Sequence, residues 1–201
     1  MLADVRVGPV VATDGATPTA RADKTGALVT TDAHGKYMEA VLRGNVFFAA
    51  NQAAATFSVG LTTTTAVGLI IANPPGSSKL IVPLQVEFVN TGVIVGVAGI
   101  SIRGYSATAI AHTTALTVSN ALIGSGNAPV GTADSGSALT AAPVVAKLLY
   151  SVLSTNTAVI SQATVYDLGG SIILPPGTAM AVLASAAITG FASCLWEEVS
   201  A

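Results

Sequence analysis

Side chains that could perform acid–base or metal chemistry are scarce in this chain of 201 residues. It has two histidines, His34 and His112, and one cysteine, Cys194. A metal or proton-transfer site needs several groups at close spacing, and only Asp32 accompanies His34. His112 follows the alternating stretch Ala107–Ala111, and that pattern predicts a place on the polar face of a strand. The sequence therefore predicts no catalytic residue, no metal site and no cofactor.

Serine and glycine also form no motif that carries chemistry. The chain has no Gly-x-Ser-x-Gly elbow, and its glycines at 124, 126 and 131 are followed neither by Lys-Ser/Thr nor by a predicted helix. Cys194 lies in the apolar stretch Gly190–Trp196, which predicts a buried structural thiol, because a reactive thiol needs a positive environment. The chain is therefore not predicted to be an enzyme.

Paired carboxylates, Glu197 and Glu198, follow Trp196. Adjacent strand residues face opposite sides, so these two cannot work as an acid/base pair. The pattern predicts that they solubilise the end of the last strand, with a pairing to Arg103 or Lys147 across an interface as the alternative. Trp196 is predicted to fill the core with its N–H hydrogen-bonded, and a role as an interface anchor is the alternative.

The low charge of the chain is its strongest indication of function. It carries eight basic and ten acidic residues, or 9%, where an ordinary soluble domain has roughly 25%. Ten of these charges fall within the first 43 residues, so the remaining 158 residues carry only eight. A body with so few charges is poorly solvated unless other subunits cover it. The sequence therefore predicts an assembly subunit, and its scattered basic residues predict no nucleic-acid partner.

Composition divides the chain into an extended N-terminal arm, residues 1–44, and a β-rich domain, residues 45–201. The last part of the arm, Lys36–Arg43, fits either a helix that stops at Gly44 or an extended strand. The extended arm is favoured because the segment buries too little of itself to fold alone. No run of about 18 clean apolar residues predicts a membrane span, and no secretory signal is predicted.

The β-rich domain is predicted to be an antiparallel β-sandwich. Its apolar residues are mostly alanine and valine, threonine is frequent, and turn residues separate short strands. Leu80–Phe88 alternates apolar residues on one face with mixed residues on the other, where Pro83 predicts an edge strand or a bulge. Residues 124–142 are predicted to form a long loop. The predicted strands are Val46–Ala50, Ala54–Leu61, Val67–Ala72, Lys79–Val89, Val93–Arg103, Thr108–Thr113, Thr117–Ile123, Pro143–Leu153, Ala158–Asp167, Ser171–Leu174, Met180–Ala184 and Thr189–Glu198.

Three segments resemble structural proteins of tailed bacteriophages. Thr30–Phe48 contains DAHGKYMEA, a short spacer and RGNVF, and is similar to a run in that family that reads approximately DAHGKYYEA, a spacer, then RGNVF. Ile172–Val182 resembles the strand–PPG–strand element of the family, and Trp196–Val199 is similar to its usual end. The resemblance covers the arm junction and the C-terminal quarter best.

This resemblance implies a jelly-roll β-sandwich, a homotrimer, and an arm that docks on other virion subunits such as the major capsid protein. It implies a virion protein, assembled in the host cytoplasm, that serves as a capsid decoration or cement protein; the alternative is a tail, baseplate or fibre-associated protein. No nucleic acid or membrane partner is expected. The arm residues expected to bind partners are Arg21, Lys24, Asp32, His34, Lys36, Tyr37, Glu39 and Arg43.

Overall fold

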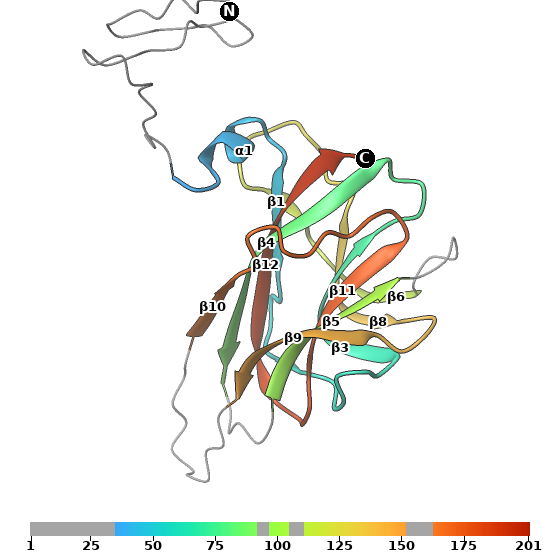
Figure 1. The fold of residues 1–201 in the computed structure, drawn as a ribbon. Helices are drawn as coiled ribbons and strands as arrows, with labels where there is room; N and C mark the ends of the chain where they lie inside the picture. Colours follow the sequence, from blue (N-terminus) through green and yellow to red (C-terminus); the bar gives the residue numbers. More distant parts are fainter. Residues whose placement is uncertain (1–34, 92–96, 105–110, 152–162) are drawn as a thin grey trace, which may run out of the picture. The chain divides into compact units, whose positions relative to one another are not determined.

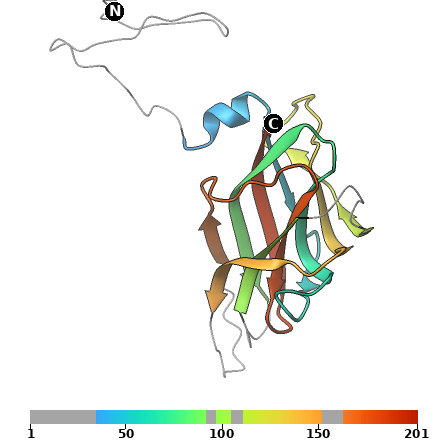
Figure 2. The same ribbon diagram turned by 45° about the vertical axis from the view of Figure 1, so that its right-hand side comes forward.

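A computed structural model of the chain describes residues 35–91, 97–104, 111–151 and 163–201. The chain divides into two units, Met1–Met38 and Glu39–Ala201, and the second holds every described strand. This second unit is an all-β sandwich of two antiparallel sheets, as predicted, and the sheets face each other across one core (Figure 1 and Figure 2). No helix among the described residues is long and apolar enough to cross a membrane.

Each sheet has six strands. The first sheet contains, in spatial order, β10 (Ala163–Asp167), β4 (Lys79–Asn90), β12 (Thr189–Ser200), β1 (Val46–Ala50) and β7 (Ser119–Asn120), and β2 (Ala55–Thr56) also pairs with β12. The second sheet contains β6 (Ala111–Leu116), β8 (Thr132–Ala138), β3 (Thr65–Asn73), β11 (Thr178–Ala184), β5 (Val97–Gly104) and β9 (Val144–Ser151).

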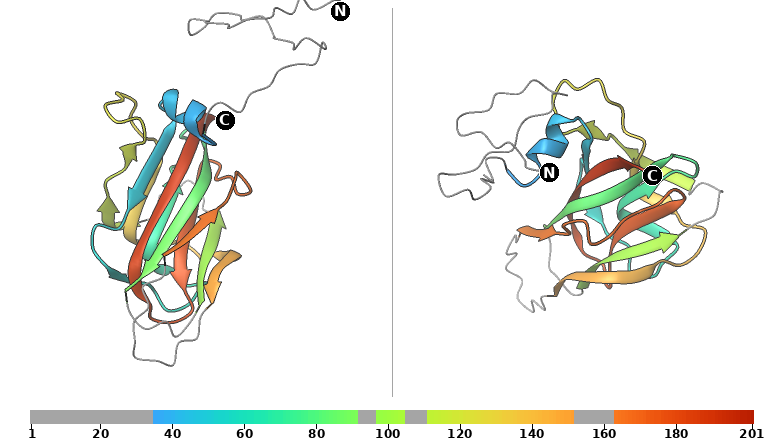
Figure 3. Two further views of the ribbon diagram at one scale, coloured as in Figure 1. Left: turned by 90° about the vertical axis from the view of Figure 1, so that its left-hand side faces the viewer. Right: turned by 45° about the horizontal axis from the view of Figure 1, so that its top comes forward.

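The main strands form four antiparallel pairs that are nested in the sequence. β1 pairs with β12, β3 with β11, β4 with β10, and β5 with β9, so each pair encloses the next along the chain. Successive pairs fall in alternate sheets, and Figure 3 (left view) shows β1, β12 and β4 side by side in the first. The segment between β5 and β9 is an insertion that adds β7 beside β1 and β8 with β6 beside β3.

The core is filled by side chains that alternate along these strands. Leu69, Met180 and Trp196 are fully buried in it, and the rings of Phe57 and Phe88 meet edge to face with their centroids 5.2 Å apart. A second, smaller cluster uses the residues that alternate with these on β3 and β11, so the middle of the second sheet is buried on both faces. Burial on both faces explains why these two strands are almost continuously apolar. The second cluster consists of Ala66, Ile70, Ala72, Leu139, Ala179, Ala181 and Leu183.

Pro83 marks a β-bulge in the middle of a sheet and not an edge. Strand β4 lies between β10 and β12, and its pairing with β12 slips by one residue at Pro83 and Leu84. The extra residue changes which side chains face the core, since Ile81 is buried before the bulge and Val86 after it. The predicted bulge is therefore confirmed, the predicted edge is wrong, and the predicted apolar face is correct only from Leu84 onward.

Most of the predicted strands are confirmed within a few residues, and the exceptions involve short pairings. Ser171–Leu174 forms no strand, only a single bridge of Leu174 with Ile81. The predicted strands Ala54–Leu61 and Thr117–Ile123 shrink to β2 and β7. The predicted loop 124–142 is wrong over β8, whose small residues fit between β3 and β6. Parts of the predicted strands, at 93–96, 108–110, 152–153 and 158–162, lie outside the described residues.

The end of the predicted extended arm is helical instead. Helix α1 covers Met38–Leu42. At its C-terminus the Gly44 N–H donates to the Val41 carbonyl and the Asn45 N–H donates to the Ala40 carbonyl, with Gly44 at φ 70°. This pair of bonds around a left-handed glycine is the Schellman cap. The favoured extended arm is therefore wrong over Met38–Leu42, and the alternative helix that stops at Gly44 is correct.

Gly68 of β3 has no room for a side chain. Its φ is +149°, and a Cβ there would overlap the Val182 carbonyl and approach the Phe57 ring to 2.6 Å. We expect Gly68→Ala to lower the free energy of unfolding by about 3 kcal/mol, because it adds overpacking to a strained backbone. Urea unfolding followed by Trp196 fluorescence measures this loss.

Gly126→Ala is the matched control, because a Cβ at Gly126 would have nothing within 4 Å. Its free energy of unfolding should stay within about 0.5 kcal/mol of the parent value. Equal losses in the two variants would contradict the close approach of β3 to Val182 and Phe57.

Candidate interaction surface

The side chains considered for chemistry in the sequence are only partly described by the structure. Within it, no three His, Cys, Asp or Glu residues lie together so that they could hold a metal ion. His34 lies outside the described residues, and His112 lies in β6. Cys194 is buried, as predicted, and burial raises the pKa of its thiol far above the ordinary value, which keeps it from forming the reactive thiolate.

Glu198 is a buried carboxylate that fastens a loop to the core. Only 4% of the residue is exposed, so the prediction that it solubilises the strand end is wrong. Its oxygens accept hydrogen bonds from the Val130 N–H at 3.0 Å, the Gly131 N–H at 2.8 Å and the Trp196 Nε1–H at 3.2 Å. A carboxylate taken out of water needs such donors, and charge-assisted bonds of this kind are among the stronger ones. The three donors therefore fix where residues 130 and 131 lie against β12.

Alternation along β12 explains why two adjacent glutamates differ. Trp196 and Glu198 are two residues apart and both are buried, whereas Glu197 between them is half-buried on the outward side. Trp196 is fully buried with its N–H bonded and its ring 6.5 Å from that of Phe47, so the predicted role as a core residue is confirmed. The inward Glu198 carboxylate is the hydrogen-bond acceptor that the buried Trp196 indole N–H needs.

Glycine at position 131 is what allows this close approach. A Cβ there would lie 2.6 Å from Ile81 Cδ1, 3.2 Å from a Glu198 oxygen and 3.3 Å from the Trp196 indole nitrogen. A larger residue would force the Ile81 side chain or the backbone at residue 131 to move. Gly131 is therefore part of the hydrogen-bonded contact with Glu198 and not of a phosphate-binding loop.

The outward side of the first sheet, called here the outer face, exposes large apolar side chains with a few polar ones among them. Exposed fractions are 42% for Phe48, 37% for Phe191 and 57% for Val165. Register places Val165 opposite Glu87 and Glu87 opposite Ser193, so three strands contribute to one continuous row. The outer face is made of Phe48, Gln85, Glu87, Val89, Val165, Phe191, Ser193 and Leu195.

Two shallow hollows lie on the outer face, one on each side of the Glu87–Ser193 pair. The Ser193 hydroxyl donates to a Glu87 oxygen at 3.0 Å, which holds this carboxylate between the hollows. Phe48 lines one hollow, of about 220 Å³, and Phe191 lines the other, of about 200 Å³. Both are smaller than the ~300–1,000 Å³ of a typical small-molecule site. They fit protruding side chains of a protein partner better than a cofactor.

The predicted arm residues are only partly placed. Arg21, Lys24, Asp32 and His34 lie outside the described residues. Among the others, the Lys36 ammonium lies 5.2 Å from the centre of the Tyr37 ring, Glu39 is in the first turn of α1, and Arg43 directly follows its last residue. Helix α1 has no buried residue. A partner-binding role for these eight residues stays a prediction.

Substitution of Glu198 tests whether its hydrogen bonds stabilise the fold. Glu198→Gln removes the charge and replaces one acceptor oxygen with an NH₂ group, which at the Oε2 place would face the Val130 N–H. We expect it to lower the free energy of unfolding by roughly 2–3 kcal/mol, because buried donors lose a charged acceptor. Chemical denaturation measures the loss.

Glu197→Gln makes the same chemical change one residue away, on the half-exposed side of β12. Its free energy of unfolding should differ from that of the parent by no more than about 0.5 kcal/mol. If both variants lost the same stability, Glu198 would not be the fastening point of the loop.

No family model, curated protein or solved structure matches this chain. The interactions that its described part can make are therefore inferred from its own surface alone. That surface presents an apolar sheet face with shallow hollows and one central carboxylate, which is suited to contact with protein.

Proposed function

We propose that this chain is a structural subunit of a tailed-bacteriophage virion and that it binds the capsid exterior as a decoration or cement protein. The observation that carries the proposal is the outer face, an apolar sheet surface on a chain with very few charges. Contiguous exposed apolar patches mark sites of contact with protein. The segments around Tyr37, Pro175 and Trp196 that resemble virion proteins direct the proposal to a phage particle.

The proposal includes the jelly-roll form of the sandwich. Its support is the nesting of the strand pairs, in which first joins last (β1 with β12), and the inner pairs follow in turn down to β5 with β9. An eight-stranded roll of two Greek keys has this order, because it is one long hairpin wrapped over two sheets. The insertion that carries β6, β7 and β8 is then an addition to one connection of the roll.

The mechanism in this proposal is adhesion by many weak contacts. Each subunit buries its outer face, including the phenyl rings of Phe48 and Phe191, against a neighbour, and Glu87 between the rings selects a partner that presents a basic group there. A homotrimer multiplies each contact, and an arm that becomes ordered on binding adds surface. Affinity then comes from copy number more than from any single contact.

Particles made from the genome that encodes this chain provide the direct test. A labelled antibody against the chain should mark the heads in negative-stain images. Label on the tail or baseplate would instead support the alternative placement, and unlabelled, fully assembled particles would overturn the virion proposal.

Lysine substitutions on the outer face should separate binding from folding. Phe48 and Phe191 are exposed, so the double variant Phe48→Lys/Phe191→Lys should keep the parent free energy of unfolding within about 1 kcal/mol. Its affinity for particles that lack the protein should fall by roughly 30-fold or more, because it removes two aromatic contacts. Co-sedimentation with particles measures the affinity. Val144→Lys, on the exposed side of β9 in the second sheet, is the matched control and should bind like the parent.

Removal of residues 1–34 tests the predicted arm separately. We expect the shortened chain to show the parent circular dichroism spectrum and to be lost from particles during co-sedimentation, because each subunit then has less surface to bury. Undiminished incorporation of the shortened chain would refute a binding role for these residues.

A further inference from the structure

The outer face is bordered by further acidic side chains. Its own charge is the carboxylate of Glu87. Asp167 follows Val165 by two residues on β10, and Glu197 occupies the outward side of β12. Because side chains two apart on a strand face the same way, these acids lie on the same side of the first sheet as the outer face. This side of the sheet is therefore acidic.

The strand residues on this side include no lysine or arginine. Lys79 is the one basic residue in the described strands of the first sheet. It lines a different hollow, next to Phe47 and Glu198, whose side chains are directed to the core. Arg103 and Lys147 belong to β5 and β9 of the second sheet. The strands of the first sheet thus supply no basic group to balance the acids on their outward side.

Burial of the outer face against another molecule would take Glu87 out of water. Its hydrogen bond from the Ser193 hydroxyl, at 3.0 Å, is a contact with a neutral donor. A buried carboxylate without a basic partner opposes binding, because its lost hydration is not replaced. The outer face of a second copy cannot supply that partner, since it would set one Glu87 against another and like charges repel. The occupant must therefore be a different surface that carries a basic group.

The two hollows determine where the apolar side chains of the occupant lie. One hollow is lined by Gln85 and Glu87, and the other by Glu87 and Val89. On an extended segment, residues i, i+2 and i+4 face one side at a spacing of about 6.6 Å. Gln85, Glu87 and Val89 follow one another on β4 with the same period. A segment with a basic residue at i+2 and apolar residues at i and i+4 therefore matches the order of features on the outer face.

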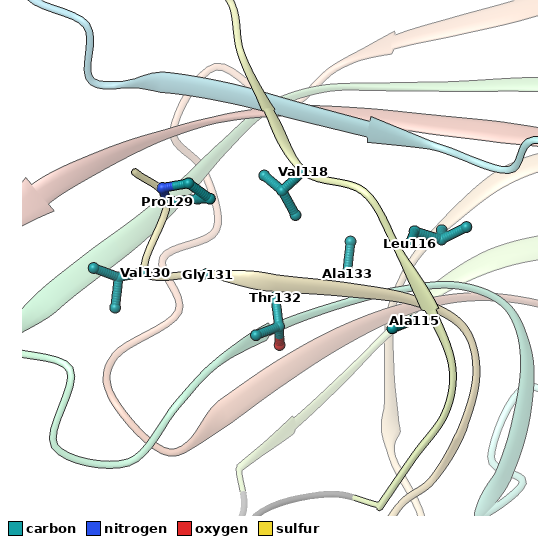
Figure 4. A pocket seen from close by; sticks show the side chains of 8 residues that line it. All are labelled: Ala115, Leu116, Val118, Pro129, Val130, Gly131, Thr132 and Ala133. Carbon is teal, nitrogen blue, oxygen red and sulfur yellow. The ribbon is translucent and has the colours of Figure 1, made fainter. Parts of the chain in front are cut away.

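The hollow in the insertion between β5 and β9 has a different character. It has a volume of about 440 Å³, and none of the residues that line it is charged (Figure 4). Thr132 is the one lining residue with a polar side chain. Such a lining specifies no chemical class of partner, whereas the acidic side of the first sheet specifies the charge of its partner.

We infer that the outer face is a site for a different protein, which presents an extended segment with one arginine or lysine between two apolar side chains. The inference rests on the proposed function, in which the outer face is buried on the particle. It adds that copies of this chain do not pair with each other through this face. Contacts within a homotrimer then lie elsewhere on the chain.

Two synthetic peptides test this partner chemistry without a particle. Acetyl-Leu-Thr-Arg-Thr-Leu-amide has the inferred order, and acetyl-Leu-Thr-Glu-Thr-Leu-amide reverses its charge alone. Two-dimensional NMR of the isotope-labelled full chain should show shifted amide signals around Glu87 and Ser193. The arginine peptide should bind roughly 5-fold more tightly than the glutamate peptide, as expected for one exposed charge pair. Equal affinities, or shifts confined to other strands, would overturn the inference.

Glu87→Gln should make the affinities of the two peptides equal within about 2-fold, because it removes the central charge and keeps the shape of the side chain. Ala142→Lys is the matched control. It changes the net charge of the chain by the same amount, at an exposed position before β9, and should keep the preference for the arginine peptide. Loss of the preference in both variants would show general electrostatic attraction and would overturn the inference.

Light scattering tests a second copy as the occupant. The mass of Glu87→Lys in solution should equal that of the parent chain, because copies do not meet through this face. A changed mass would show that a second copy occupies the outer face and would overturn the inference. A chain that is absent from phage particles would refute the proposed function without altering these readouts. A chain that coats particles but prefers neither peptide would refute the inference alone.

Discussion

The buried carboxylate of Glu198 is the interaction on which the most distinctive part of the molecule depends. It joins the indole of Trp196 in the core to the backbone N–H groups of Val130 and Gly131, which lie at the entry to β8. Without it, two backbone N–H groups of the insertion and the indole N–H of Trp196 would need other partners. One side chain on the last strand thus fixes the backbone that leads into a strand about 65 residues earlier in sequence.

The low charge of the chain goes together with the burial of both faces in the middle of the second sheet. The second sheet buries both faces of β3 and β11, while the first sheet leaves an outer face with Phe48, Phe191 and a central Glu87 exposed. The molecule therefore covers the outward side of β3 and β11 with its own residues and leaves the outer face of the first sheet exposed. The outer face is therefore one place where the low charge of the sequence is visible at the surface.

Local patterns in the sequence predicted the strands and the core well, and contacts distant in sequence were the part they could not predict. The alternation of Leu80–Phe88 gave the correct inward face only after the bulge, because an added residue reverses the alternation. Glu198 reads as a solvated acid until its partners, 67 and 68 residues away, are known. The outer face depends on register across four strands, β10, β4, β12 and β1. Strand β8 was missed because its small residues acquire strand structure only between β3 and β6.

Nesting of the strand pairs also constrains how the chain folds. The innermost pair, β5 with β9, closes a shorter stretch of chain than any pair outside it, whereas Val46 of β1 must find Glu197 of β12. Pairing between such distant segments is slow, since loop-closure entropy must be overcome before the contact forms. During synthesis on the ribosome, β1 therefore waits beside an open sheet edge, the condition in which β proteins associate wrongly. A chain with so few charges has little electrostatic repulsion to oppose wrong association before β12 pairs with β1.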